Sequence, residues 1–263
     1  MKKLAALLIS LLLVCLCAVG VCANNALPSA YVTIADANGN LVLTCEEIHY
    51  YDYDKDGIQT INDVLAIAHI EKYPNGIDGY AFEDSVYGLS MTKLWGAQTG
   101  AYGYYINNAS PASLLDTISN GDHIQAFVYT DTIGFSDTFC FFDTTSMACD
   151  VNDTVTLTLC ALTYDENWNT VTIPVANAEI LVNNEPIGVY TDENGKVSFV
   201  MKADGKVIVS ARSDAMTLVP PVCKITSNGS SLLIILIIVA VAIVAVATVT
   251  FVTIKKHIST RKI

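Results

Sequence analysis

The chain has 263 residues, 52% of them hydrophobic, and its mean hydropathy of +0.44 is too apolar for an ordinary soluble domain unless a membrane segment raises it. Residues 24–231 hold all 26 acidic residues and only eight basic ones, which gives this segment a net charge of −18. This charge disfavours nucleic acid and anionic lipid as partners, and it is compatible with calcium and cationic surfaces. Aromatic and β-branched residues run throughout this segment, which excludes disorder along its whole length.

Residues 1–23 have the pattern of a signal peptide. Lys2 and Lys3 precede an apolar run from Leu4 to Val14, and Val21-Cys22-Ala23 offers the small residues that a signal peptidase needs. We therefore expect residues 1–23 to be removed and the segment that follows to lie outside the cell.

Near the other end, residues 232–254 form an uncharged apolar run of 23 residues, and a helix needs about 20 to cross a bilayer. A tail at residues 255–263 follows and carries four basic residues: Lys255, Lys256, Arg261 and Lys262. The positive-inside rule keeps such a cluster in the cytoplasm. The sequence therefore predicts one transmembrane helix at 232–254 and a single-pass cell-membrane protein whose N-terminal part is extracellular.

Between these segments, residues 30–145 are predicted to form one α+β domain. Tyr31–Ile34 and Leu41–Thr44 flank an Asn-Gly turn, which indicates a β-hairpin. Apolar residues at helical spacing then predict a helix over 61–73. Further strands are expected at 88–94, 102–106 and 124–129. A hairpin, one helix and more strands are typical of a sheet with the helix packed across one face.

Residues 150–226 are predicted to form a second, all-β domain. Short β-prone runs alternate with Asn-, Asp- and Gly-rich turns at about ten-residue spacing, a pattern typical of a small β-sandwich. The expected strands are 155–162, 170–173, 178–182, 189–191, 196–201 and 206–211.

An acidic turn before the predicted helix has the spacing of a calcium-binding loop. Asp52, Asp54, Asp56 and Asp63 occupy positions 1, 3, 5 and 12, and Gly57 stands at position 6, where such loops turn sharply. Carboxylate oxygens are ligands that calcium prefers, so calcium is the cofactor that the sequence suggests.

A second interpretation of the same turn is structural. Gln59 stands at position 8, where such loops usually carry an apolar residue, and Asp63 is shorter than the usual glutamate at position 12. An aspartate or Thr60 would then serve to cap the helix. The sequence leaves both interpretations open.

Four segments in this order resemble the transcobalamin C-terminal-like domain of unknown function, a β-grasp module common on bacterial surfaces: Thr60–His69, Tyr87–Gly96, Tyr102–Asn108 and Ile118–Phe127. That family shows a V-x-D-A-L helix, a glycine-rich Y-Y-V-N hairpin and an L-x-D-G-D turn into its last strand. The resemblance covers about residues 30–145 and implies a β-grasp-like fold there.

The family's analogy with corrinoid binding implies a candidate ligand site. Trp95, Tyr102, Tyr104 and Tyr105 carry rings able to stack on a flat or sugar ligand. Strand aromatics also commonly pack against the helix of their own domain, so this alternative stays open. The second domain is similar to carboxypeptidase-regulatory-like and bacterial immunoglobulin-like sandwiches through Pro174–Asn183 and Thr191–Val197.

Five cysteines remain outside the signal peptide: Cys45, Cys140, Cys149, Cys160 and Cys223. An odd number cannot pair completely within one chain, and no C-x-x-C motif indicates zinc or a thioredoxin-like site. Disulfides, which an extracellular compartment permits, and buried free thiols both remain open.

The extracellular histidines His49, His69 and His123 belong to no recognised catalytic motif. We therefore expect a non-enzymatic bacterial cell-surface protein, a binding or adhesion module on a stalk, whose partner is an extracellular protein, glycan or small ligand. The alternatives are a component of a corrinoid or other small-ligand receptor and a calcium-dependent surface assembly protein.

Overall fold

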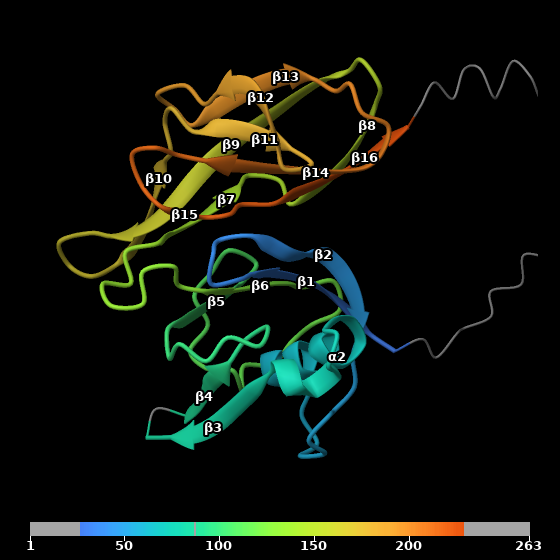
Figure 1. Ribbon diagram of the computed structural model, residues 1–263, viewed down its shortest axis with the longest axis vertical. Helices are drawn as coiled ribbons and strands as arrows, with labels where there is room; N and C mark the ends of the chain where they lie inside the picture. Colours follow the sequence, from blue (N-terminus) through green and yellow to red (C-terminus); the bar gives the residue numbers. More distant parts are fainter. Residues whose placement is uncertain (1–26, 87, 229–263) are drawn as a thin grey trace, which may run out of the picture.

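The computed structural model describes residues 27–86 and 88–228. These residues form two β-rich units that lie one above the other in Figure 1, joined by a linker over residues 129–137. The predicted signal peptide at 1–23, span at 232–254 and tail at 255–263 lie outside the described residues. Among the helices that the structure describes, none is long and apolar enough to cross a membrane.

The first unit is built on a four-stranded sheet with the order β2-β1-β6-β5. Its strands are β1 (Ser29–Ala35), β2 (Leu41–His49), β5 (Tyr102–Ile106) and β6 (His123–Val128). β1 pairs antiparallel with β2 and parallel with β6, and β5 returns antiparallel to β6. The predicted hairpin is confirmed: the Asp36 carboxylate accepts the N–H groups of Asn38 and Asn40, and Gly39 takes a φ of +75°.

The predicted helix is also confirmed, as α2 (Ile61–Lys72). Its apolar residues repeat at helical spacing, so Val64, Leu65 and Ala68 are fully buried in one core cluster with residues of β1 and β2. A 3₁₀ turn, η1 (Gly76–Gly79), follows, and then the two-stranded hairpin β3 (Ala81–Ser85) and β4 (Gly88–Lys93). The hairpin forms its own sheet and does not join the four-stranded one.

The second unit consists of two five-stranded sheets. One sheet contains β10 (Thr170–Pro174), β9 (Thr154–Tyr164), β7 (Thr138–Phe142), β15 (Leu218–Val219) and β13 (Lys196–Val200). The other has the order β12 (Glu185–Tyr190), β11 (Glu179–Val182), β14 (Gly205–Arg212), β16 (Cys223–Asn228) and β8 (Ser146–Asp150). Val155, Leu157 and Leu159 of β9 share one buried cluster with Val207 and Val209 of β14, so the core lies between the sheets. The predicted sandwich is confirmed.

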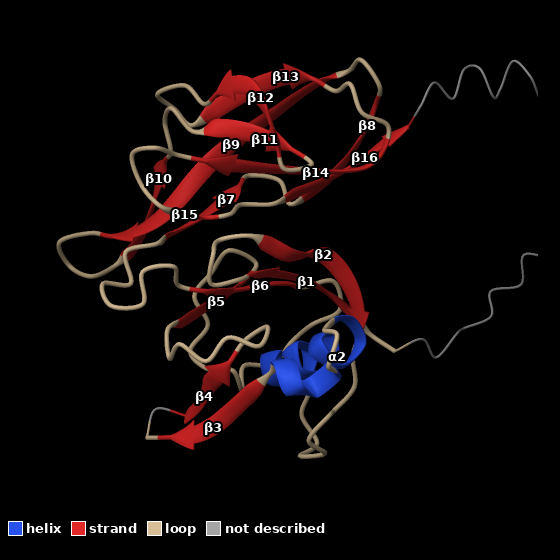
Figure 2. Cartoon of the chain, in the orientation of Figure 1, coloured by secondary structure: helices blue, strands red, loops and turns tan. Residues whose placement is uncertain are grey.

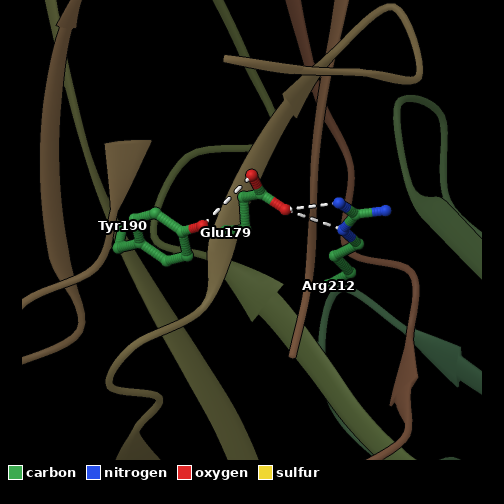
Figure 3. A network of polar contacts seen from close by, with 3 residues as sticks. All are labelled: Glu179, Tyr190 and Arg212. Carbon is green, nitrogen blue, oxygen red and sulfur yellow. Dashed lines mark hydrogen bonds and ion pairs between the residues drawn. The ribbon is translucent and has the colours of Figure 1, made fainter. Parts of the chain in front are cut away.

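A polar contact across three neighbouring strands marks their register (Figure 3). Glu179 of β11 lies opposite Arg212 of β14 and Tyr190 of β12 in the two ladders. The Arg212 Nη2 atom lies 2.6 Å and its Nε atom 2.8 Å from Glu179 Oε2, and the Tyr190 hydroxyl donates to Glu179 Oε1 over 3.3 Å. A slip by one residue would turn these side chains to opposite faces, so the contact favours the observed register.

The two units are packed together through a small apolar cluster. Ala35 and Phe127 of the first unit and Phe139 and Val219 of the second are its buried members. The ring of Tyr105 stacks on that of Phe139 at a centroid distance of 3.6 Å and an interplanar angle of 11°. At another point of the junction, Lys224 Nζ of β16 donates to the Cys45 carbonyl of β2 over 3.0 Å.

The expected fold class, which began with an α+β β-grasp-like domain, is wrong. Figure 2 shows that the described chain is mostly β, with α2 as its one α-helix. The sequence prediction relied too much on this helix, because a run of 12 helical residues is easier to recognise than short strands paired at long range.

The boundary between the two units lies earlier in the chain than the sequence predicted. β7 pairs with β9, so this strand belongs to the sandwich although the prediction assigned residues up to 145 to the first unit. β8, which pairs in parallel with β16, also belongs to the sandwich and begins before the predicted start of that domain at residue 150. β3, β15 and β16 were likewise absent from the predicted elements. Each of these pairings depends on a partner that the local sequence does not reveal.

Candidate functional site

The acidic loop between β2 and α2 brings three of the four predicted calcium ligands together. Asp52, Asp54 and Asp63 each place one carboxylate oxygen within 4.8 Å of the other two. Asp56 is not part of this group, and its Oδ1 atom accepts the N–H of Ile58 over 2.8 Å. The remaining loop contacts run from main-chain N–H groups to carboxylates, as Asp52 accepts from both Asp56 and Gly57.

Asp63 also forms the helix cap. It is fully buried, and its carboxylate accepts the main-chain N–H of Tyr53 over 2.8 Å and that of Thr60 over 2.7 Å. The Thr60 hydroxyl oxygen accepts the Asp63 N–H in return, which completes a capping box. The structural interpretation of this turn is therefore confirmed, and calcium binding stays a prediction.

The electrostatics of the loop suit a cation. Loss of solvent around the carboxylate raises the pKa of Asp54, and the nearby charges of Asp63 and Asp56 raise it further. Closely spaced carboxylates repel one another, and a bound divalent ion with oxygen ligands would relieve that repulsion. Asp52, Asp54 and Asp63 are thus the residues with the geometry to hold calcium.

The four aromatic residues predicted to bind a ligand lie in two different places. Trp95, Tyr102 and Tyr104 pack against the core on the α2 side of the first unit, whereas Tyr105 packs against the junction cluster. The Trp95 ring lies 5.2 Å from that of Tyr73. The Tyr102 hydroxyl lies within hydrogen-bond distance of the carbonyls of residues 92 and 97. The structure does not bring the four rings to one surface, because successive residues of β5 face opposite sides of the sheet.

Sequence reasoning missed a polar cluster beside a cleft between the units. The cleft has a volume of about 890 Å³, and Cys45, His123 and Lys224 are among the residues that line it. His123 Nε2 lies 2.8 Å from Thr33 Oγ1 and 3.8 Å from Cys45 Sγ. Cys45 has a φ of +45°, a left-handed conformation that is uncommon for residues other than glycine.

A thiol beside an imidazole is an arrangement that thiol nucleophiles use, but the electrostatics here oppose that role. Burial raises the pKa of the Cys45 thiol and lowers the pKa of His123 to about 4. Both groups are therefore neutral at neutral pH, whereas an activated pair holds a thiolate beside an imidazolium. Cys45 and His123 lie far apart in the sequence, so no local motif could have revealed their contact.

All five cysteines within the described residues are free thiols. Cys45, Cys140 and Cys223 are buried, and Cys149 and Cys160 are half-buried. Burial raises the pKa of Cys223 to about 12, so this thiol is inert at neutral pH. Of the two interpretations that the sequence left open, the structure shows free thiols, three of them buried.

Comparison with known proteins does not assign the chain to a family. No family model and no curated protein matches it. Among solved structures it is similar to the D0-D1 domain of intimin, with 17% identity, 74% of this chain and 94% of that chain covered, and a TM-score of 0.24.

Two further similarities are to the N-terminal four Ig domains of Dscam1 isoform 9.44 and to the polymeric Ig receptor ectodomain of a teleost fish. The first has 10% identity, covers 56% of this chain and 32% of that chain, and has a TM-score of 0.23. The second has 9% identity, covers 57% and 73%, and has a TM-score of 0.20. The chain thus spans about a third of the Dscam1 structure that it matches. Similarities this low establish neither a family nor a function for the chain.

Proposed function

We propose that this chain is a non-enzymatic binding module displayed at the cell surface and held there by the apolar segment 232–254. The observation that carries the proposal is the packed junction between the units. Tyr105 stacks on Phe139, and Lys224 bonds to the Cys45 carbonyl, so the two β-rich units form one continuous body. A body of this kind offers an extended surface to a macromolecular partner.

The chemistry of the described residues agrees with a binding role. The Cys45–His123 pair is kept neutral by burial, which does not favour nucleophilic catalysis. The net charge of −18 over residues 24–231 favours a cationic partner over an anionic one. A corrinoid-receptor role is not proposed, because Trp95, Tyr102 and Tyr104 pack within their own unit.

Surface display is tested on intact cells that express the full chain with a tag at its C-terminus. Added protease should release the extracellular part and leave the tag protected, because the basic tail at 255–263 holds that end inside. Detection of the tag by antibody on unbroken cells would overturn this topology.

Binding is tested by flow cytometry on the same cells with labelled probes of three classes: cationic peptides, neutral oligosaccharides and anionic peptides. We expect saturable binding of a cationic probe that weakens as salt is added, because exposed charges are screened. Cells that bind no probe above the level of untransformed cells would overturn the proposed function.

A further inference from the structure

A group of large apolar side chains is exposed beside the junction of the two units. We call it the aromatic patch and define it as Ile133, Phe135, Tyr164 and Trp168. Ile133 is 91% exposed, Trp168 83%, Tyr164 56% and Phe135 51%. Ile133 and Phe135 belong to the linker 129–137. Tyr164 ends β9, and Trp168 lies in the turn after it. Figure 1 shows this linker and the β9–β10 turn on the same side of the molecule.

Ring contacts connect the patch to the buried junction cluster. The Phe127 ring of β6 contacts that of Tyr129 at 5.0 Å, and the Tyr129 ring contacts that of Phe135 in the linker at 5.3 Å, both edge to face. On the sandwich side, Leu162 of β9 packs against the same cluster, and Tyr164 lies two residues further along the same face. The patch therefore lies on the linker and the sandwich, at the outer rim of the packed junction.

The loops that carry the patch are held in place by their own hydrogen bonds. The Asp131 carboxylate accepts the N–H groups of Ile133 and Gly134 and the Ser136 hydroxyl. The Asp165 carboxylate accepts the N–H groups of Asn167 and Asn169 in the β9–β10 turn. The apolar side chains are thus displayed on ordered loops, which reduces the entropy that a partner would have to overcome on binding.

Phe135 and Trp168 also have unusual backbone conformations. Their φ angles are +51° and +62°, in the left-handed region that aromatic residues rarely occupy. In both loops a residue with an unfavourable φ angle has a large apolar side chain that is exposed to water. A surface that exposes large apolar side chains on neighbouring strained loops is typical of an interaction site, and the pairing of β7 with β9 places these two loops beside each other.

The charge around the patch indicates the kind of partner. The linker 129–137 and the segment 164–170 contain no basic residue. Glu166 is exposed and Asp131 and Asp165 are half-buried, whereas Asp137 is buried and bonded within the linker. The faces of tryptophan and tyrosine rings attract cations, and arginine stacks on them best. An oligosaccharide would also stack on the rings and bond to carboxylates through its hydroxyls, but a neutral sugar gains no charge attraction from them, whereas a cationic segment does.

We propose that the aromatic patch docks a basic segment of a protein partner, with arginine or lysine over Trp168 and Tyr164 and aliphatic side chains against Ile133 and Phe135. This inference rests on the proposed binding function and names the partner class and the surface. The carboxylates of both loops supply the attraction that orients the basic segment.

The test uses the full chain in detergent and a fluorescent peptide of alternating arginine and leucine, followed by anisotropy. We expect saturable binding that weakens with salt and that falls by about tenfold or more in Trp168→Ala and in Phe135→Ala. A peptide of alternating glutamate and leucine should not bind. Tyr190→Ala is the matched control, because Tyr190 is 56% exposed like Tyr164 but lies on the other sheet, and it should bind as the parent does.

Several results would overturn the inference. Equal affinity of the arginine peptide for the parent and Trp168→Ala would show that the patch is not the docking surface, while leaving the binding function in place. Binding of chitin oligosaccharides but not of the arginine peptide, lost in Trp168→Ala, would assign the patch to glycans. An equal loss in Tyr190→Ala would show a general effect of removing surface aromatic residues. Melting temperatures of the variants, expected to match the parent, check that each is folded.

Discussion

His69 of α2 accepts a hydrogen bond at Nε2 from the main-chain N–H of Trp95, 3.1 Å away. Its Nδ1 atom lies 2.6 Å from the carbonyl oxygen of Leu65, to which it donates. These two partners assign the proton to Nδ1 and require a neutral ring. The imidazole also stacks on the Tyr80 ring at 5.0 Å, so it joins the helix to the segments on both sides of the β3–β4 hairpin.

Stability should fall as the pH is lowered from about 6.5 to about 4. Burial lowers the pKa of His69 and of His123 to about 4, so the unfolded chain binds protons in this range and the folded chain does not. Each histidine contributes at most roughly 3 kcal/mol to this loss. Urea unfolding at a series of pH values measures it. The double variant His69→Gln, His123→Gln should be less stable at neutral pH and show a shallower slope, and an unchanged slope would contradict the prediction.

Calcium should raise the melting temperature, and Asp54→Ala should abolish the effect. Asp54 belongs to the group of three carboxylates and Asp56 does not, so Asp54 is the more informative position. The stabilisation should reach about 2.7 kcal/mol at a hundredfold excess of calcium over its Kd, and the titration should extend to several millimolar, roughly the range of extracellular sites.

Asp165→Ala is the control for the calcium experiment, because Asp165 also accepts main-chain N–H groups in a turn but has no carboxylate cluster around it in the described part of the chain. This variant should still respond to calcium. If magnesium raises the melting temperature as much as calcium does, or if Asp54→Ala responds to calcium like the parent, the loop has no calcium site and serves only to cap the helix.

Thr60→Ala should destabilise the first unit by about 1–2 kcal/mol, because it removes the hydroxyl of the capping box. Thr60→Ser keeps the hydroxyl and should lose clearly less. Chemical unfolding of both variants measures the difference. Equal losses would attribute the effect to the missing methyl group rather than to the cap.

Phe139→Ala should uncouple the two units. The side chain is 4% exposed and stacks on Tyr105, and its removal should cost about 3 kcal/mol. Hydrogen exchange followed separately in β6 and β9 should show one opening free energy in the parent and two in the variant. Phe139→Leu keeps most of the apolar volume and should retain the coupling. Coincident exchange in Phe139→Ala would show that the units are coupled through other contacts.

The sequence by itself determined the local elements. The Asn38-Gly39 turn, the capped helix at Ile61–Lys72 and most sandwich strands follow from turn residues and apolar periodicity, which act over a few residues. The acidic loop could likewise be identified from its spacing, and three of its four carboxylates do meet.

Only the tertiary structure decided how these elements associate. Alternation along a strand shows that two sets of side chains face opposite sides, but it does not show what covers each side. The partners of β7 and β8 follow from long-range pairing, as do the contact of Cys45 with His123 and the stacking of Tyr105 on Phe139. The aromatic patch arises in the same way, because its two loops are separate in the sequence and are brought together by the antiparallel pairing of β7 with β9.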